Sequence, residues 1–103
     1  MGDGQKQYLV TIDEEALEMM ENHLDFLSNV SIGAAEKLAN QLKNGVASLE
    51  FMPQRCPIYR TINTSKKYRR LIVGRHEIIF SIDEASNTVK VKYILDSRQN
   101  NEF

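Results

Sequence analysis

The hydrophobic and polar positions along the chain follow two different periods. Residues 7–12 alternate, with Tyr8, Val10 and Ile12 on one face, which predicts a short strand. Two stripes with helical spacing follow and predict two amphipathic helices. The first stripe comprises Leu17, Met20, Leu24 and Leu27, and the second comprises Ala35, Leu38, Leu42, Val46 and Leu49. The polar break at 28–31 is short, which predicts an antiparallel helical hairpin.

Several residues around these stripes indicate where the helices begin and end. Asp13 stands at the N-cap position of the first helix, and Ser31 stands at that of the second. Gly45 lies inside the second helix, where glycine costs about 1 kcal/mol relative to alanine, so we expect a close contact there. Pro53 and Pro57 cannot continue a helix and therefore end the helical region.

After Pro57 the period changes from 3.6 to 2, which predicts a series of strands. The expected strands are residues 58–62, 68–73, 76–82 and 88–95, joined by the polar turns 63–67, 74–75 and 83–87. Together with the N-terminal strand, this pattern predicts an α+β domain with the helical hairpin packed on one face of a mostly antiparallel sheet. The other sheet face is then partly polar, and we expect the function there.

Composition limits the class of protein. The 103 residues make one domain, 1–103, and we expect frayed tails at 1–6 and 99–103. The single cysteine, Cys56, excludes an internal disulfide framework and a multi-cysteine zinc site, and we expect neither a metal nor a cofactor. No apolar run reaches the ~20 residues of a membrane span, and the N-terminus has no signal-peptide pattern. We therefore expect a cytoplasmic protein that does not bind membranes.

The net charge of -1 hides a strong segregation of charge. Residues 1–50 carry nine acidic and three basic residues, whereas 51–76 carry seven basic residues and no acidic one. Residues 77–103 carry five acidic and three basic residues. Such asymmetry indicates an anionic partner for segment 51–76, and the alternative is a solvated basic hairpin without a partner.

Three segments, taken in order, carry a resemblance to a known family. They are LEFMPQRCP at 49–57, YRRLIVGRHEIIF at 68–80 and VKVKYILDSR at 89–98. Over about residues 8–98 the chain resembles the RelE/ParE superfamily of toxins from type II toxin–antitoxin systems. The resemblance implies a protein that arrests growth unless a cognate antitoxin neutralises it. RelE-like members cleave mRNA in the ribosomal A site, and ParE-like members inhibit DNA gyrase.

RNA cleavage through its own 2′-OH requires a base, an acid and cations that stabilise the charge building on phosphorus. The resemblance places Arg69 or Arg70 at the family's basic position before the hairpin turn, and Arg98 at the one that ends the last strand. Because successive strand residues point to opposite faces, only one of the first two can lie in the site, and we favour Arg70. Glu77 stands where nucleolytic members commonly carry arginine. It is either a general base or the partner of a neighbouring arginine.

His76 has an intrinsic pKa suited to acid–base work, but it shares a strand face with Ile78 and Phe80 and is also interpretable as structural. The candidate catalytic residues are therefore Arg70, Arg98, Glu77 and His76. The candidate RNA or phosphate contacts are Arg69, Arg75, Lys66 and Lys67. Tyr68 and Tyr93 remain candidates for base stacking or for the acid. We expect His23 to be exposed, and Cys56 could be exposed but has no catalytic role.

Three functions remain open at this point. The first, which we favour from the sequence, is a ribosome-dependent mRNA endonuclease, indicated by the basic segment and by the superfamily resemblance. The second is a non-enzymatic gyrase inhibitor. It is favoured by the long helical hairpin and by missing catalytic positions. Glu77 stands in place of an arginine, and the sequence after Arg98 is short where many RelE-like members carry a catalytic tyrosine or histidine. The third is a binding module without toxicity, which Glu77 also indicates. The expected partners are an antitoxin and either the ribosome with mRNA or DNA gyrase.

Overall fold

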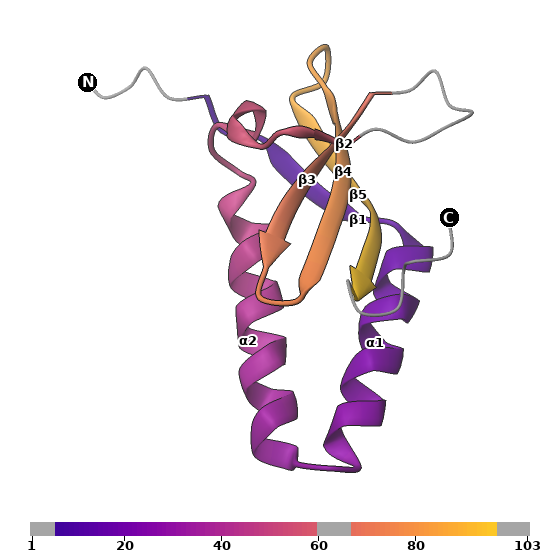
Figure 1. Ribbon diagram of the computed structural model, residues 1–103. Coiled ribbons are helices and arrows are strands. Elements are labelled where there is room, and N and C mark those ends of the chain that lie inside the picture. The colour runs from indigo at the N-terminus through magenta and orange to yellow at the C-terminus, as the bar shows by residue number, and fades with distance from the viewer. Residues whose placement is uncertain (1–5, 60–66, 97–103) are drawn as a thin grey trace.

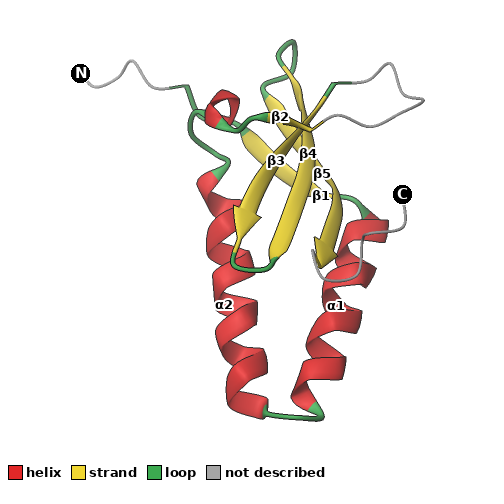
Figure 2. Ribbon diagram, in the orientation of Figure 1, coloured by secondary structure: helices red, strands yellow, loops and turns green. Residues whose placement is uncertain are grey.

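The computed structural model describes residues 6–59 and 67–96 (Figure 1). The elements are β1 Leu9–Ile12, α1 Glu14–Ser28, α2 Ile32–Ser48, the 3-10 helix η1 Pro53–Arg55, β2 Ile58–Tyr59, β3 Tyr68–Val73, β4 His76–Asp83 and β5 Thr88–Asp96. Figure 2 shows that α1 and α2 form a hairpin whose turn extends well beyond the sheet. Neither helix is long and apolar enough to cross a membrane.

The five strands form one sheet in the order β1-β5-β4-β3-β2. The β1–β5 pair is parallel, and the β2–β3, β3–β4 and β4–β5 pairs are antiparallel. Gly74 has a φ of 59°, which lets it occupy the first position of the two-residue turn between β3 and β4. The expected α+β architecture is confirmed. The expected strand at 58–62 begins as predicted, but 60–62 and most of the polar turn lie outside the described residues.

Both helix starts lie where the sequence predicts them, but their caps differ. Ser31 Oγ accepts a hydrogen bond from Ala34 N at 3.1 Å and so caps α2. Asp13 makes no side-chain cap to α1, and its carboxylate instead accepts a hydrogen bond from Lys92 Nζ at 2.9 Å. The N-cap position was therefore predicted correctly, but the expected hydrogen bond was replaced by one to β5.

The core lies between the helical hairpin and one face of the sheet. Its largest fully buried side chains include Phe80, Leu42, Leu49, Ile78, Ile94, Val89 and Val91. Each contributes about 1.5–3 kcal/mol of burial free energy relative to an exposed position. Gly45 allows α2 to approach β3, because a Cβ at this position would lie 2.7 Å from Val73 Cγ2. The expected close contact at Gly45 is confirmed.

Candidate functional site

The strand register separates the residues of the central strands into two faces. Leu71, Ile78 and Ile94 are paired across β3, β4 and β5 and lie on the face that the helices cover. Arg70, by contrast, is paired with Ile79 and lies on the opposite, open face. Arg69 precedes it and points to the helical side, as strand alternation requires.

Arg70 and Glu77 form an ion pair on the open face. Arg70 Nη1 lies 3.8 Å from Glu77 Oε1, and the two side chains are 38% and 12% exposed. They come from adjacent strands, because Glu77 is paired with Ile72, two residues beyond Arg70. The geometry therefore supports the interpretation of Glu77 as the ion-pair partner of a neighbouring arginine.

Two other arginines of the basic segment donate hydrogen bonds to backbone carbonyls. Arg69 Nη1 donates to Gln54 O at 3.1 Å and to Cys56 O at 2.6 Å, which ties β3 to the segment around η1. Arg55 Nη1 donates to Phe51 O at 2.8 Å and to Met52 O at 3.1 Å, just beyond the end of α2. The Arg55 guanidinium also donates to Ser48, the last residue of α2, at its carbonyl oxygen (3.4 Å) and at its hydroxyl (3.0 Å), and so contributes to the cap of this helix end. These guanidinium groups hold the fold together at the exit from the helical region.

His76 is buried, with 6% of its surface exposed, beneath the helical hairpin. Its ring centroid lies 5.1 Å from that of His23, and the rings are tilted by 54°. The expectation that His23 is exposed is therefore wrong. His23 is half-buried because this part of α1 packs against the sheet, which the helical spacing of leucine and methionine alone did not indicate.

Cys56 is also buried, with 3% of its surface exposed, so the possibility that it is exposed is excluded. Burial raises the pKa of its thiol, which disfavours the thiolate that cysteine chemistry requires. The absence of a catalytic role for Cys56 stays a prediction. Within 6–59 and 67–96, no group of three or more histidine, cysteine or acidic side chains could hold a metal ion.

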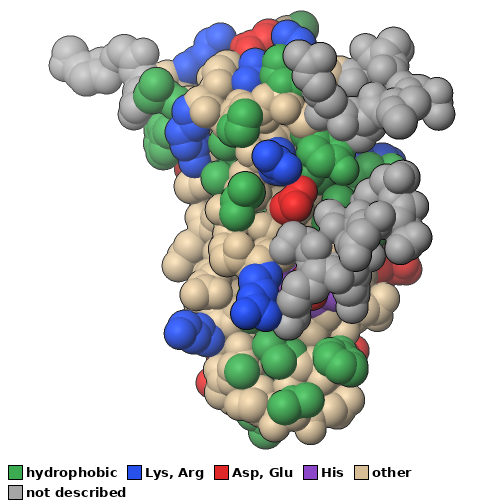
Figure 3. Space-filling model, in the orientation of Figure 1, with side chains coloured by type: hydrophobic (Ala, Val, Ile, Leu, Met, Phe, Trp, Pro, Cys, Tyr) green, Lys and Arg blue, Asp and Glu red, His purple; other side chains and the backbone are tan. Residues whose placement is uncertain are grey.

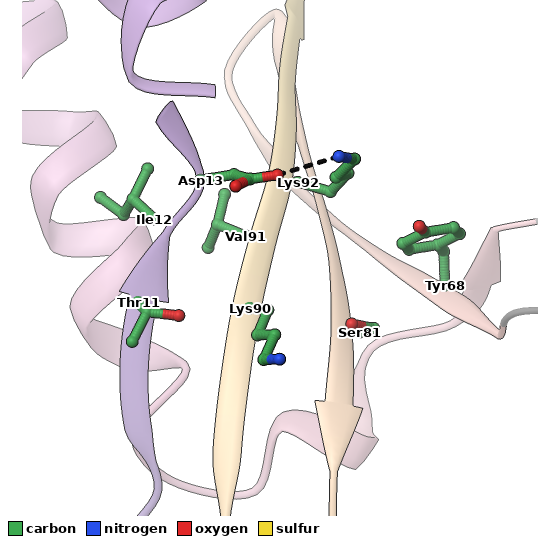
Figure 4. A pocket seen from close by; sticks show the side chains of 8 residues that line it. All are labelled: Thr11, Ile12, Asp13, Tyr68, Ser81, Lys90, Val91 and Lys92. Carbon is green, nitrogen blue, oxygen red and sulfur yellow. Dashed lines mark hydrogen bonds and ion pairs between the residues drawn. The ribbon is translucent and has the colours of Figure 1, made fainter. Parts of the chain in front are cut away.

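A depression of about 390 Å³ lies on the open face near the β1 edge of the sheet (Figure 4). It is lined by Thr11, Ile12, Asp13, Tyr68, Ser81, Lys90, Val91 and Lys92. The hydrogen bond from Lys92 lowers the pKa of Asp13, and the same bond raises the pKa of Lys92. Sequence reasoning did not propose Lys90 and Lys92 as binding residues, although polar residues that alternate with Val89 and Val91 mark a solvent-facing strand side.

A polar cluster joins three segments that are distant in the sequence. Tyr8 Oη donates to Glu84 Oε1 at 2.8 Å, and Gln54 Nε2 donates to Tyr8 Oη at 2.7 Å and to Glu84 Oε2 at 2.9 Å. The hydrogen bond from Gln54, followed by that from Tyr8, lowers the pKa of Glu84. The cluster connects the segment before β1 with η1 and with the β4–β5 turn, and it has no counterpart in any local sequence motif.

The remaining candidate residues do not gather around Arg70. Arg75 is exposed in the turn between β3 and β4, and Lys67 is exposed before β3. Lys66 and Arg98 lie outside the described residues. Figure 3 shows Lys and Arg side chains distributed over the visible face, with no single continuous patch of them. Among the described candidate residues, Arg70 and Glu77 are thus the two that the structure brings into contact as an ion pair.

Comparison with known proteins identifies the family of this chain. A family model described as the ParE toxin of the type II toxin–antitoxin system parDE matches residues 10–101. The chain belongs to this ParE toxin family. As the sequence resemblance implied, it is thus a toxin of the RelE/ParE superfamily of type II toxin–antitoxin systems. No curated protein matches the sequence.

Two solved structures share the ParE-like fold. A structure described as the chromosomal ParDE toxin–antitoxin system from P. aeruginosa superposes with a TM-score of 0.67 at 15% identity, covering 85% of this chain and 94% of that one. The archaeal RelE-RelB complex from Pyrococcus horikoshii OT3 gives a TM-score of 0.54 at 12% identity, covering 90% and 98%. At these identities the likeness shows the fold alone.

Proposed function

We propose that this ParE-family toxin arrests growth by binding DNA gyrase without cutting nucleic acid. The observation that carries the proposal is the pairing of Arg70 with Glu77 at 3.8 Å. An arginine that neutralises a neighbouring carboxylate has less charge to offer a phosphorane, and that carboxylate repels the phosphate itself. The match of the ParE family model over residues 10–101 supports the same mechanism.

The other arginines favour the same conclusion. Arg69 and Arg55 are both engaged with backbone carbonyls, so neither guanidinium is free to close around a substrate without breaking contacts of the fold. Phosphoryl transfer by a metal-free site depends on cations aimed at the developing charge. A stoichiometric inhibitor requires only a complementary surface and is compatible with this arrangement.

We also propose a cognate antitoxin as the partner that neutralises this toxin. The solved relatives come from a ParDE system and a RelE-RelB complex, and both are described as pairs. Lys90 on the open face and Arg75 in the β3–β4 turn are exposed and can pair with acidic side chains of an extended or helical antitoxin segment. We expect the affinity of this complex to fall as salt concentration rises.

A second candidate function is the RelE-like, ribosome-dependent mRNA endonuclease. It is favoured by Arg70, which remains 38% exposed on the open face and could exchange Glu77 for a phosphate. In that case Arg70, Arg98, Glu77 and His76 would be the catalytic candidates. Arg69, Arg75, Lys66 and Lys67 would contact the phosphates.

Pulse labelling after induced expression separates the two functions. We expect incorporation of label into DNA to stop before incorporation into protein, and purified toxin to inhibit supercoiling by purified gyrase. Arg70→Gln should retain both effects, as should the matched surface variant Arg75→Gln. An early translation block with mRNA cleavage that Arg70→Gln abolishes, while Arg75→Gln does not, would assign the endonuclease function instead.

A further inference from the structure

The turn of the helical hairpin exposes three large apolar side chains far from the sheet. Phe26, Val30 and Ile32 are 72%, 74% and 68% exposed. In Figure 3, hydrophobic side chains gather at this end of the molecule, where the hairpin turn lies in Figure 1. Single exposed apolar residues are common, but a cluster of them marks an interaction surface. We call Phe26, Val30 and Ile32 the hairpin tip.

The hairpin tip is held in a defined conformation. The backbone N–H groups of Val30 and Ser31 both donate to Leu27 O at 2.9 Å, and Ser28 Oγ donates to Asp25 O at 2.8 Å. Ser31 then caps α2 through its bond from Ala34 N. Since the turn is already ordered, a partner that docks on the tip loses little binding free energy to ordering it.

An acidic stripe leads along α1 to the hairpin tip. Glu14, Glu18, Glu21 and Asp25 recur at spacings of 4, 3 and 4, which places them on one helix face, and all four are exposed. Helix α1 contains five acidic residues and no lysine or arginine. Within 6–59 and 67–96, no lysine or arginine forms an ion pair with any of the four; Lys92 pairs with Asp13 and Glu15 at the sheet end. The stripe is therefore available to an external cationic surface.

We propose that the hairpin tip and the acidic stripe form the surface through which this toxin docks on its target protein. The expected partner is a protein whose surface has an apolar hollow that receives the tip. Lysine or arginine side chains beside that hollow would pair with the carboxylates of the stripe. The stripe repels the phosphates of a nucleic acid and also repels a second copy of itself. This inference rests on the proposed function and identifies gyrase as the occupant, with the open sheet face left to the antitoxin.

The test uses the full chain with two variants and a matched control. Phe26→Ser/Val30→Ser/Ile32→Ser removes the apolar tip, and Glu21→Lys/Asp25→Lys reverses half of the stripe. All five positions are exposed, so we expect both variants to fold and to bind the antitoxin as the wild type does. Leu9→Thr is the control, because Leu9 is an equally exposed apolar residue, at 66%, on strand β1.

The measurements are the affinity for purified gyrase and growth arrest after induction without antitoxin. We expect each variant to lose about tenfold or more in affinity, as substitutions at interface hot spots do. The Leu9→Thr control should stay within about twofold of the wild type. Raising salt from about 50 to about 300 mM should weaken binding of the wild type more than binding of the charge-reversed variant.

Several outcomes would overturn the inference. If the tip variant binds gyrase as tightly as the wild type and still arrests growth, the hairpin tip is not part of the docking surface. A concentration-dependent dimer that the tip substitutions dissolve would assign the surface to a second copy of the chain. If the wild type arrests growth but does not bind or inhibit gyrase, the proposed function fails separately. Loss of arrest in the tip variant, with antitoxin binding intact, would then still support target docking through the tip.

Discussion

The basic segment 51–76 and helix α1 have opposite charge, and the structure uses their charges differently. In the basic segment, Arg55 and Arg69 donate to backbone carbonyls and Arg70 pairs with Glu77. In α1, the acidic stripe has no lysine or arginine partner within 6–59 and 67–96. Three arginines that charge counts single out as a binding surface are therefore already engaged in internal contacts. Helix α1, which has no lysine or arginine, keeps its four stripe carboxylates available to a partner, alongside the exposed Lys67 and Arg75 of the basic segment.

In these two regions, the number of charged side chains and their availability to a partner are therefore separate properties. A guanidinium group offers five donors in a fixed geometry, so it suits the capping of helix-end carbonyls as well as it suits phosphate. A row of carboxylates on a helix has no comparable internal use, because exposed backbone N–H groups are lacking beyond the first turn. Substitution of each arginine therefore measures how firmly its guanidinium is committed to the fold.

Arg69→Met gives the largest expected effect on stability. Its two hydrogen bonds to Gln54 O and Cys56 O link β3 to the η1 segment, and loss of bonds from a charged donor costs about 1.5–3 kcal/mol in free energy of unfolding. Urea denaturation measures this change. Arg75→Met, in the exposed turn, should change stability by less than about 0.5 kcal/mol. Equal stability of both variants would show that Arg69 is free to serve a partner.

Arg55→Met should lower the free energy of unfolding by about 1 kcal/mol. This effect is smaller than that of Arg69→Met because the carbonyl partners of Arg55 are exposed to water. The change should appear in the urea midpoint. Hydrogen exchange should also rise at the C-terminal turn of α2 more than at its N-terminal turn. Uniform exchange along α2 would contradict a capping role for Arg55.

The ion pair between Arg70 and Glu77 should give a smaller coupling. A double-mutant cycle with Arg70→Met and Glu77→Gln should return about 0.5–1 kcal/mol of interaction free energy, because Arg70 is partly exposed and the distance is 3.8 Å. Thermal or urea unfolding of the four proteins measures it. A coupling near zero would mean that Arg70 is available on the open face, which strengthens the endonuclease alternative.

The smallest expected effect is the pH dependence from Glu84. Hydrogen bonds from Gln54 and then Tyr8 lower the pKa of Glu84 in the folded protein below its ordinary value of 4.5. Its stabilising contribution is therefore complete above that value and is lost as pH falls through the lowered pKa. Gln54→Ala should flatten the decline of stability below pH 4.5 compared with the wild type. Unfolding curves collected across acidic pH measure this, and an unchanged decline would exclude the bond from Gln54 as its cause.

Much of the fold could be predicted from residue patterns because its elements are strongly periodic. The alternation around Ile78 and Phe80 located β4, and the spacing of Leu38, Leu42 and Val46 located α2. Gly45 was interpretable as a close contact because glycine inside a helix is costly without one. His23 was misjudged because its burial depends on His76, fifty-three positions later, and no local pattern carries that information.

Residue patterns alone were sufficient to establish the α+β architecture, the segregation of charge and the family to which the chain belongs. Each of these follows from local periodicity, composition or motif order, which persist whatever the side chains contact. Which charges are available to a partner could be established only from the tertiary structure. Strand register places Arg70 beside Glu77, and strand alternation directs Arg69 toward Cys56 O. Because the helical hairpin extends beyond the sheet, Phe26 stays exposed to water. The physical reason is that a charge or an apolar side chain can bind a partner only if the fold has not already satisfied it.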